Sequence, residues 1–108
     1  MISTRAEQAK PEEARGLLEE LWDELAPKLW PKVTHDLHCR AETFARLLDI
    51  DTPEAHLAAA MMLRDKAVPL VLRDSTPIGP CVLYGAYACN AATPALTLIA
   101  AIARSLGQ

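Results

Sequence analysis

Three side chains that could hold a metal or act in nucleophilic catalysis lie close together in the sequence: His35, His38 and Cys39. Imidazole and thiolate are ligands that zinc prefers. On a helix, at about 100° per residue, His35 and Cys39 share one face while His38 turns toward the flank. Two ligands at a four-residue step bind a metal only if another segment or subunit supplies the rest. A solvated polar face is therefore the favoured interpretation, and we predict no metal and no cofactor.

The other chemistry-bearing residues indicate no reaction. No glycine-rich nucleophile turn surrounds Cys39, so a surface thiol is favoured over a catalytic one. The carboxylate pairs Glu19–Glu20 and Asp49–Asp51 are explained by a solvated face and a helix end. The chain has only four glycines and no phosphate-binding loop. We predict no catalytic residues and no enzyme activity, and keep a small metal- or thiol-dependent enzyme as an alternative.

The chain's three cysteines are an odd set without secretory features, so reduced thiols are expected rather than a disulfide framework. Cys81 and Cys89 fall within one apolar run, residues 81–89, which predicts a single strand. Residues eight apart on an extended strand are beyond disulfide reach.

Hydrophobic periodicity predicts the elements that must position these side chains. Residues 1–10 are polar and unpatterned, which favours a flexible N-terminus, followed by a single α+β domain over residues 11–108. The first helix is expected to end or kink in the segment bracketed by Pro27 and Pro31, because proline cannot continue an interior helix ladder. Thr34 and Thr93-Pro94 are typical helix starts, and so is Pro53 preceded by either Asp51 or Thr52 as the cap. The predicted helices cover residues 11–26, 34–49, 52–65 and 93–106.

Two strand-like segments, residues 67–73 and 81–89, flank turn-forming residues and predict an antiparallel hairpin with a mobile tip. The predicted fold class is α+β and mostly helical: three N-terminal helices, an antiparallel β-hairpin and a C-terminal helix that packs on the hairpin. The free edges of a hairpin can pair with another chain, so a homodimer through the hairpin edge is one expectation.

Charge and hydropathy narrow the partner classes. A net charge of -3 and scattered basic residues make nucleic-acid binding unlikely. Imitation of nucleic acid by the acidic first helix is left open. No signal peptide and no membrane span are recognised, so we expect a cytoplasmic protein with a protein partner.

Five residues are candidates for a protein interface. Tyr84 and Tyr87 are expected on opposite faces of one strand, so that one packs on a helix and the other faces solvent or a partner. Trp30, between Pro27 and Pro31, is expected to fill a corner of the core. Glu19 and Asp23 belong to the acidic outer face of the first helix.

The segments 52–60 and 90–98, with the hairpin between them, resemble the small phage and prophage proteins called phage ABA sandwich domain proteins. In that family an Ala- and Leu-rich helix leads to a two-stranded meander and a closing helix that begins Ala-Thr-Pro-Ala-Leu, as residues 92–96 do here. The resemblance implies no catalytic residues. It implies a non-catalytic phage or prophage accessory protein that acts by protein–protein interaction, one form being an inhibitor of a host defence or regulatory protein. A self-associating structural or assembly protein is the alternative.

Overall fold

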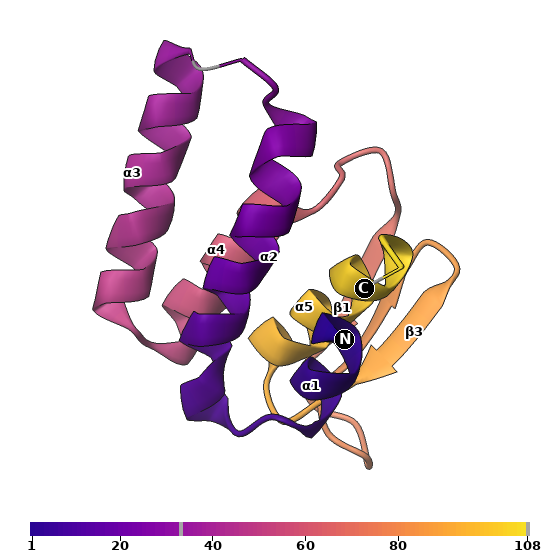
Figure 1. Ribbon diagram of the computed structural model, residues 1–108. Helices are drawn as coiled ribbons and strands as arrows, with labels where there is room; N and C mark the ends of the chain where they lie inside the picture. The colour runs from indigo at the N-terminus through magenta and orange to yellow at the C-terminus, as the bar shows by residue number, and fades with distance from the viewer. Residues whose placement is uncertain (33, 108) are drawn as a thin grey trace.

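The computed structural model describes residues 1–32 and 34–107 (Figure 1). The fold is mostly helical α+β, and its C-terminal helix packs on the strands, as predicted from the sequence. In chain order the elements are α1 (Ile2–Gln8), the 3-10 turn η1 (Pro11–Glu13), α2 (Ala14–Leu29), α3 (His35–Ile50), α4 (Pro53–Leu63), β1 (Leu70–Arg73), β2 (Cys81–Tyr84), β3 (Tyr87–Asn90) and α5 (Pro94–Ser105).

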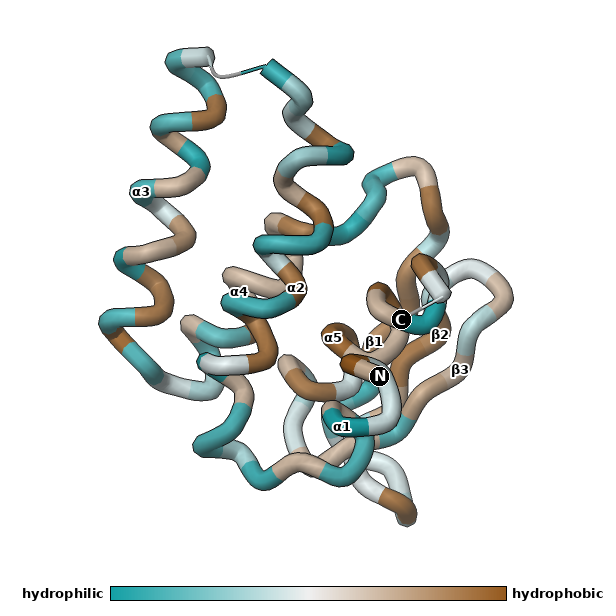
Figure 2. The backbone as a smooth tube through the Cα atoms, viewed as in Figure 1, coloured by the Kyte–Doolittle hydropathy of each residue, from teal (hydrophilic) through white to brown (hydrophobic). Residues whose placement is uncertain are grey.

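Helix α5 is the centre of the fold. Every residue from Ala95 to Ala103 is buried, because the sheet covers one side of the helix and α1, α2 and α4 cover the rest. Figure 2 shows the apolar residues gathered along α5 and the strands. Helix α3 lies outermost, against α4, and buries only Phe44 and Leu48.

Three threonines cap helices: Thr34 and Thr93 as predicted, and Thr52 as one of the two residues, with Asp51, that the sequence left open. The Oγ1 atoms of Thr34, Thr52 and Thr93 each accept a hydrogen bond of 3.2 Å from the backbone N–H three residues later. These bonds satisfy donors that have no partner within the first helical turn. Pro53 and Pro94 occupy the first helical position, where a missing N–H costs nothing. Local sequence therefore sets these three helix starts.

The predicted flexible N-terminus over residues 1–10 is instead the helix α1. Ile2, Ala6 and Ala9 are buried, and α1 packs along α5. Glu7 also forms an ion pair with Arg104 of α5. A two-turn helix is unstable alone, so its order comes from this packing and not from its own sequence.

The helix α2 ends between Pro27 and Pro31, as predicted, but at Leu29, so that Pro27 lies inside its last turn and the helix runs three residues beyond the predicted range 11–26. Proline in the last turn removes one backbone hydrogen bond and leaves the rest of the ladder intact. The N–H of Trp30 still donates to the carbonyl of Ala26, at 2.9 Å.

The predicted hairpin is a three-stranded antiparallel sheet in the order β1-β2-β3. The apolar run 81–89 is not one strand, because Gly85 and Ala86 turn the chain between β2 and β3. Gly85 has a φ of +59° and Ala86 has no positive φ, which is the pattern of a type II′ hairpin turn rather than of type I′, where both central residues have a positive φ. In register, Val71 lies opposite Leu83, and Leu83 lies opposite Ala88.

Candidate interaction surface

The strand register sorts the side chains onto two faces of the sheet, because opposed residues point to the same face and successive residues alternate. The inner face packs on α5, and the outer face has no element over it among the described residues. The inner-face residues are Leu70, Leu72, Val82, Tyr84, Tyr87 and Cys89; the outer-face residues are Val71, Arg73, Cys81, Leu83, Ala88 and Asn90.

An exposed apolar cluster occupies the outer face. Val71 is 49% exposed, Leu83 is 53% exposed, and Ile78 in the β1–β2 loop is 72% exposed. Together with Ala88 these residues line a groove of about 400 Å³ over the sheet. We refer to Val71, Ile78, Leu83 and Ala88 as the outer patch. Contiguous exposed apolar side chains of this kind are typical of protein-binding surfaces.

Asn90 fixes the loop that carries Ile78. Its side-chain Nδ2 donates to the carbonyl oxygens of Ile78, at 2.9 Å, and Pro80, at 2.7 Å. Within the loop, the N–H of Gly79 donates to the carbonyl of Thr76 at 3.0 Å. These bonds hold Ile78 at the rim of the groove, so the patch is preformed.

The ends of the groove differ in charge. Arg73, at the end of β1, is exposed and has no ion pair within residues 1–32 and 34–107. Glu7 lines the opposite end, and its carboxylate is already engaged by Arg104. The unbalanced charge at the groove is therefore the positive charge of Arg73.

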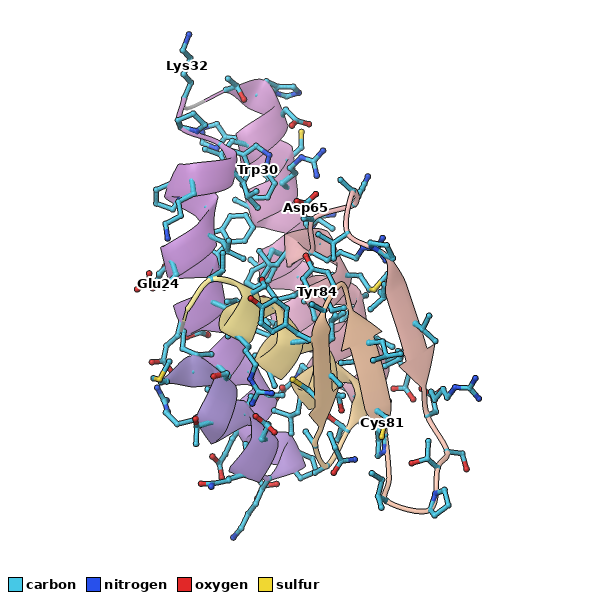
Figure 3. The ribbon with its side chains drawn as sticks, turned by 90° about the vertical axis from the view of Figure 1, so that its right-hand side faces the viewer. Glu24, Trp30, Lys32, Asp65, Cys81 and Tyr84 are labelled. Carbon is cyan, nitrogen blue, oxygen red and sulfur yellow. The ribbon has the colours of Figure 1, made fainter. Side chains whose placement is uncertain are left out.

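Tyr84 and Tyr87 lie on different strands and are paired across the β2–β3 turn, which corrects the prediction that they occupy opposite faces of one strand. Tyr84 is buried, and its hydroxyl accepts a 2.7 Å hydrogen bond from the N–H of Asp65 (Figure 3). Tyr87 is 36% exposed. One tyrosine packs inside and the other reaches solvent, but neither belongs to the outer patch.

Trp30 does not fill the core as expected. It is half-buried between α2 and α3, with its ring centroid 5.5 Å from that of Trp22 and the guanidinium of Arg40 5.3 Å above it. Figure 3 shows Trp30 at the opposite end of the molecule from Cys81 on the sheet. Trp30 therefore helps attach α3 and is remote from the outer patch.

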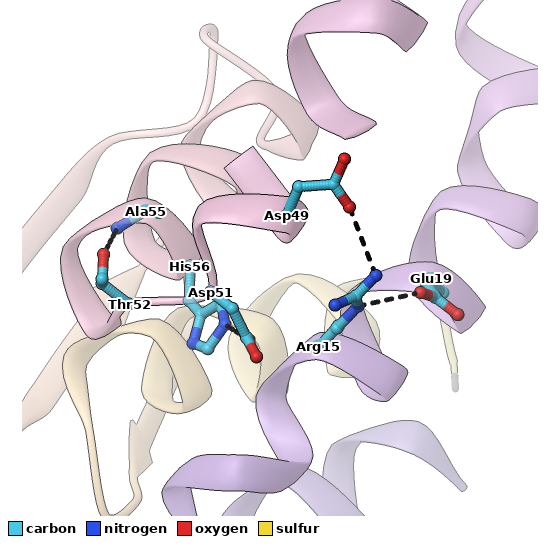
Figure 4. A network of polar contacts seen from close by, with 7 residues as sticks. All are labelled: Arg15, Glu19, Asp49, Asp51, Thr52, Ala55 and His56. Atoms are coloured by element: carbon cyan, nitrogen blue, oxygen red, sulfur yellow. Dashed lines mark hydrogen bonds and ion pairs between the residues drawn. The ribbon is translucent and has the colours of Figure 1, made fainter. Parts of the chain in front are cut away.

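The acidic face of α2 is partly neutralised. Glu19 lies 3.6 Å from Arg15, whose guanidinium also reaches Asp49 at 3.4 Å (Figure 4). Asp23 is exposed on the same helix. Arg5 donates two hydrogen bonds to Glu20, of 2.8 and 2.6 Å, which hold the pKa of Glu20 below its ordinary value. Because basic side chains interrupt it, this face does not present a continuous row of negative charge.

His35, His38 and Cys39 lie on the exposed surface of α3. His35 and Cys39 share a face as expected, with Nε2 and Sγ 3.6 Å apart. Over the described part of the chain, no three His, Cys, Asp or Glu side chains are placed to hold a metal ion. The structure brings this pair together without adding a third group.

A histidine that the sequence analysis did not single out is buried at the junction of α3 and α4. Nε2 of His56 lies 2.7 Å from Oδ1 of Asp51 (Figure 4). Asp51 adopts a left-handed conformation, with φ 56° and ψ 44°, and ends α3. The neighbouring hydroxyls of Thr52 and Thr93 are used as helix caps. The pair therefore links the end of α3 to the first turn of α4. The signal in the sequence was a polar residue, His56, in the first turn of an otherwise apolar helix.

The two sheet cysteines point to opposite faces. Cys81 lies opposite Asn90 on the outer face, and Cys89 lies opposite Val82 on the inner face. All three cysteines are free thiols. Burial raises the pKa of Cys89 above its ordinary value. A disulfide between Cys81 and Cys89 is excluded by the register rather than by distance along one strand.

No helix in the described part of the chain is long and apolar enough to cross a membrane. Comparisons with protein-family models, curated proteins and solved structures found no match to the chain.

Proposed function

We propose that this chain is a non-catalytic interaction protein that binds another protein across the outer patch. The observation that carries the proposal is the preformed groove of about 400 Å³, around which three large apolar side chains are each 49% exposed or more. In antiparallel sheets the solvent face is ordinarily polar. Because these apolar side chains are exposed, they contribute little buried surface to the fold. Their position favours a contact with another molecule.

The groove favours a particular chemistry in its partner. Apolar side chains line its floor and rim, and Arg73 supplies a positive charge at the β1 end. A segment with an apolar anchor and a nearby carboxylate complements both features. The phage or prophage origin and the inhibition of a host protein stay predictions.

The test is site-specific photo-cross-linking in the cells from which the sequence comes. A photoreactive amino acid at position 83 should trap one protein in preference to others, whereas the same group at position 24, on α2, should not. With the trapped protein purified, Leu83→Glu should weaken binding at least about tenfold, because it buries a charge in an apolar contact.

Arg73→Glu should weaken binding less, chiefly by slowing association and changing its salt dependence. Asp23→Lys on α2 is the matched control and should leave binding unchanged. Equal trapping from positions 83 and 24, or full affinity in the Leu83→Glu variant, would show that the outer patch is not the binding surface.

A further inference from the structure

The two edges of the sheet are not equivalent. Along β3, the guanidinium of Arg104 donates to the carbonyl oxygen of Ala88 at 3.4 Å. Along β1, no strand pairs with the outward edge within the described residues. An uncovered strand edge presents unpaired N–H and C=O groups that can pair with another chain. β1 is therefore the edge of this sheet that is open to pairing.

The ladder shows which β1 groups point outward. The N–H of Gly85 donates to the carbonyl of Pro69 at 2.9 Å, so the backbone of Pro69 faces β2. Antiparallel ladders alternate, so Val71 and Arg73 also face β2, while Leu70 and Leu72 present their N–H and C=O groups outward. Pro69 therefore removes no donor from the open edge.

The central residues of β1 carry no feature that would discourage pairing with another strand. Exposed edge strands usually carry a charge, a proline or a bulge that discourages pairing. Leu70, Val71 and Leu72 are consecutive apolar residues, and the charge of Arg73 comes only at the end of the strand. Leu70 and Leu72 are half-buried and Val71 is exposed, so apolar surface remains accessible on both faces.

We propose that two copies of this chain join along β1 as an antiparallel pair centred on Val71. In an antiparallel pair, opposed side chains point to the same face of the sheet. If both outer faces are to lie on one side of the joined sheet, the two-fold axis must pass between the two copies of one residue, which then face each other. Centred on Val71, it pairs Leu70 of each copy with Leu72 of the other. All four outward backbone groups of each strand then form hydrogen bonds.

The chemistry of β1 favours a second copy as the occupant. A partner strand must be apolar on both faces to cover Leu70, Val71 and Leu72, and β1 is itself such a strand. In the Val71-centred register Arg73 lies opposite Pro69 of the second copy, so the two arginines are far apart. A register centred on Leu72 would set Arg73 against Val71, and a parallel pair would bring like charges together.

Cysteine cross-linking tests the register directly. Facing residues at the two-fold axis form a non-hydrogen-bonded pair with Cα atoms about 4.5 Å apart, which is within disulfide reach. In a Cys39→Ser background, oxidation of the Val71→Cys variant with copper phenanthroline should give a covalent dimer. Leu83→Cys, on the same face one strand further in, is the matched control and should stay largely monomeric.

Light scattering over a range of concentrations supplies the second readout. The wild-type chain should shift toward twice the monomer mass as its concentration rises. Val71→Glu sets two carboxylates face to face and should raise the concentration needed for dimerisation at least about tenfold. Circular dichroism checks that the variant folds.

The inference is overturned if the wild-type chain keeps the monomer mass at every concentration. It is also overturned if Leu83→Cys cross-links as well as Val71→Cys, which would indicate association face to face. Leu83→Glu should weaken binding of the protein partner proposed above without affecting dimerisation. The failure of one proposal can therefore be told apart from the failure of the other.

Discussion

The two faces of the sheet carry apolar side chains of similar character and differ in what covers them. On the inner face Val82 is 2% exposed under α5, while its neighbour Leu83 on the outer face is 53% exposed. Helix α5 packs on the inner face, and α1, α2 and α4 pack on α5. The hydrophobic effect drove the inner face into the core, whereas no described element is positioned to cover the outer one. Apolar character alone therefore does not identify the core of this protein.

The largest expected difference is in the free energy of unfolding of two variants, each with one residue truncated on one face of the sheet. Val82→Ala should lower the free energy of unfolding by about 2 kcal/mol, because it leaves a cavity under α5. Leu83→Ala should change it by less than about 0.5 kcal/mol. Urea titration followed by circular dichroism measures both. An equal loss in the two variants would mean that the outer patch belongs to the folding core.

A smaller loss is expected at the end of the inner face. Tyr84→Phe deprives the N–H of Asp65 of its acceptor and should cost about 1–2 kcal/mol. Tyr87→Phe, at the position paired with Tyr84, should be nearly neutral because Tyr87 is partly exposed. Urea midpoints compare the two variants, and a neutral Tyr84→Phe would show that the hydroxyl does not anchor the sheet to the α4–β1 connection.

The smallest expected change in the free energy of unfolding comes from the titration of Cys89 at alkaline pH. Because burial raises its pKa in the folded state, the unfolded chain loses this proton first. The stability that the buried, neutral Cys89 thiol contributes is therefore fully present below the unfolded-state pKa of Cys89, and it is lost as pH rises through the folded-state pKa. The Cys89→Ala variant should lose less stability than wild type over that interval, as measured by urea titration at several pH values.

Thiol labelling sharpens the same comparison between faces. Cys39 is exposed, Cys81 is half-buried and Cys89 is buried, so they should react with a thiol reagent in that order. Peptide mapping after timed labelling identifies each site. Early modification of Cys89 in the folded protein would indicate that α5 covers the inner face less closely than described.

Sequence reasoning succeeded where the determinants are local. The threonine caps at Thr34, Thr52 and Thr93 act within one helical turn, so their residue types are sufficient to locate the helix starts. It failed at Gly85, where an apolar run read as one strand is divided by a turn. It also missed Val71, Leu83 and Ile78 as a site, because the apolar residues of one strand do not reveal which face will be covered.

The amino-acid sequence by itself determined the mostly helical α+β class, the capped helix starts and the positions of the strand-forming segments, because these depend on neighbours within a few residues. Tertiary structure alone decided that residues 2–8 form a helix on α5, that His56 meets Asp51, and that one apolar face of the sheet is left open. The physical reason is that burial is a property of packed elements: α5 can cover only one face of the sheet, and a single strand does not specify which.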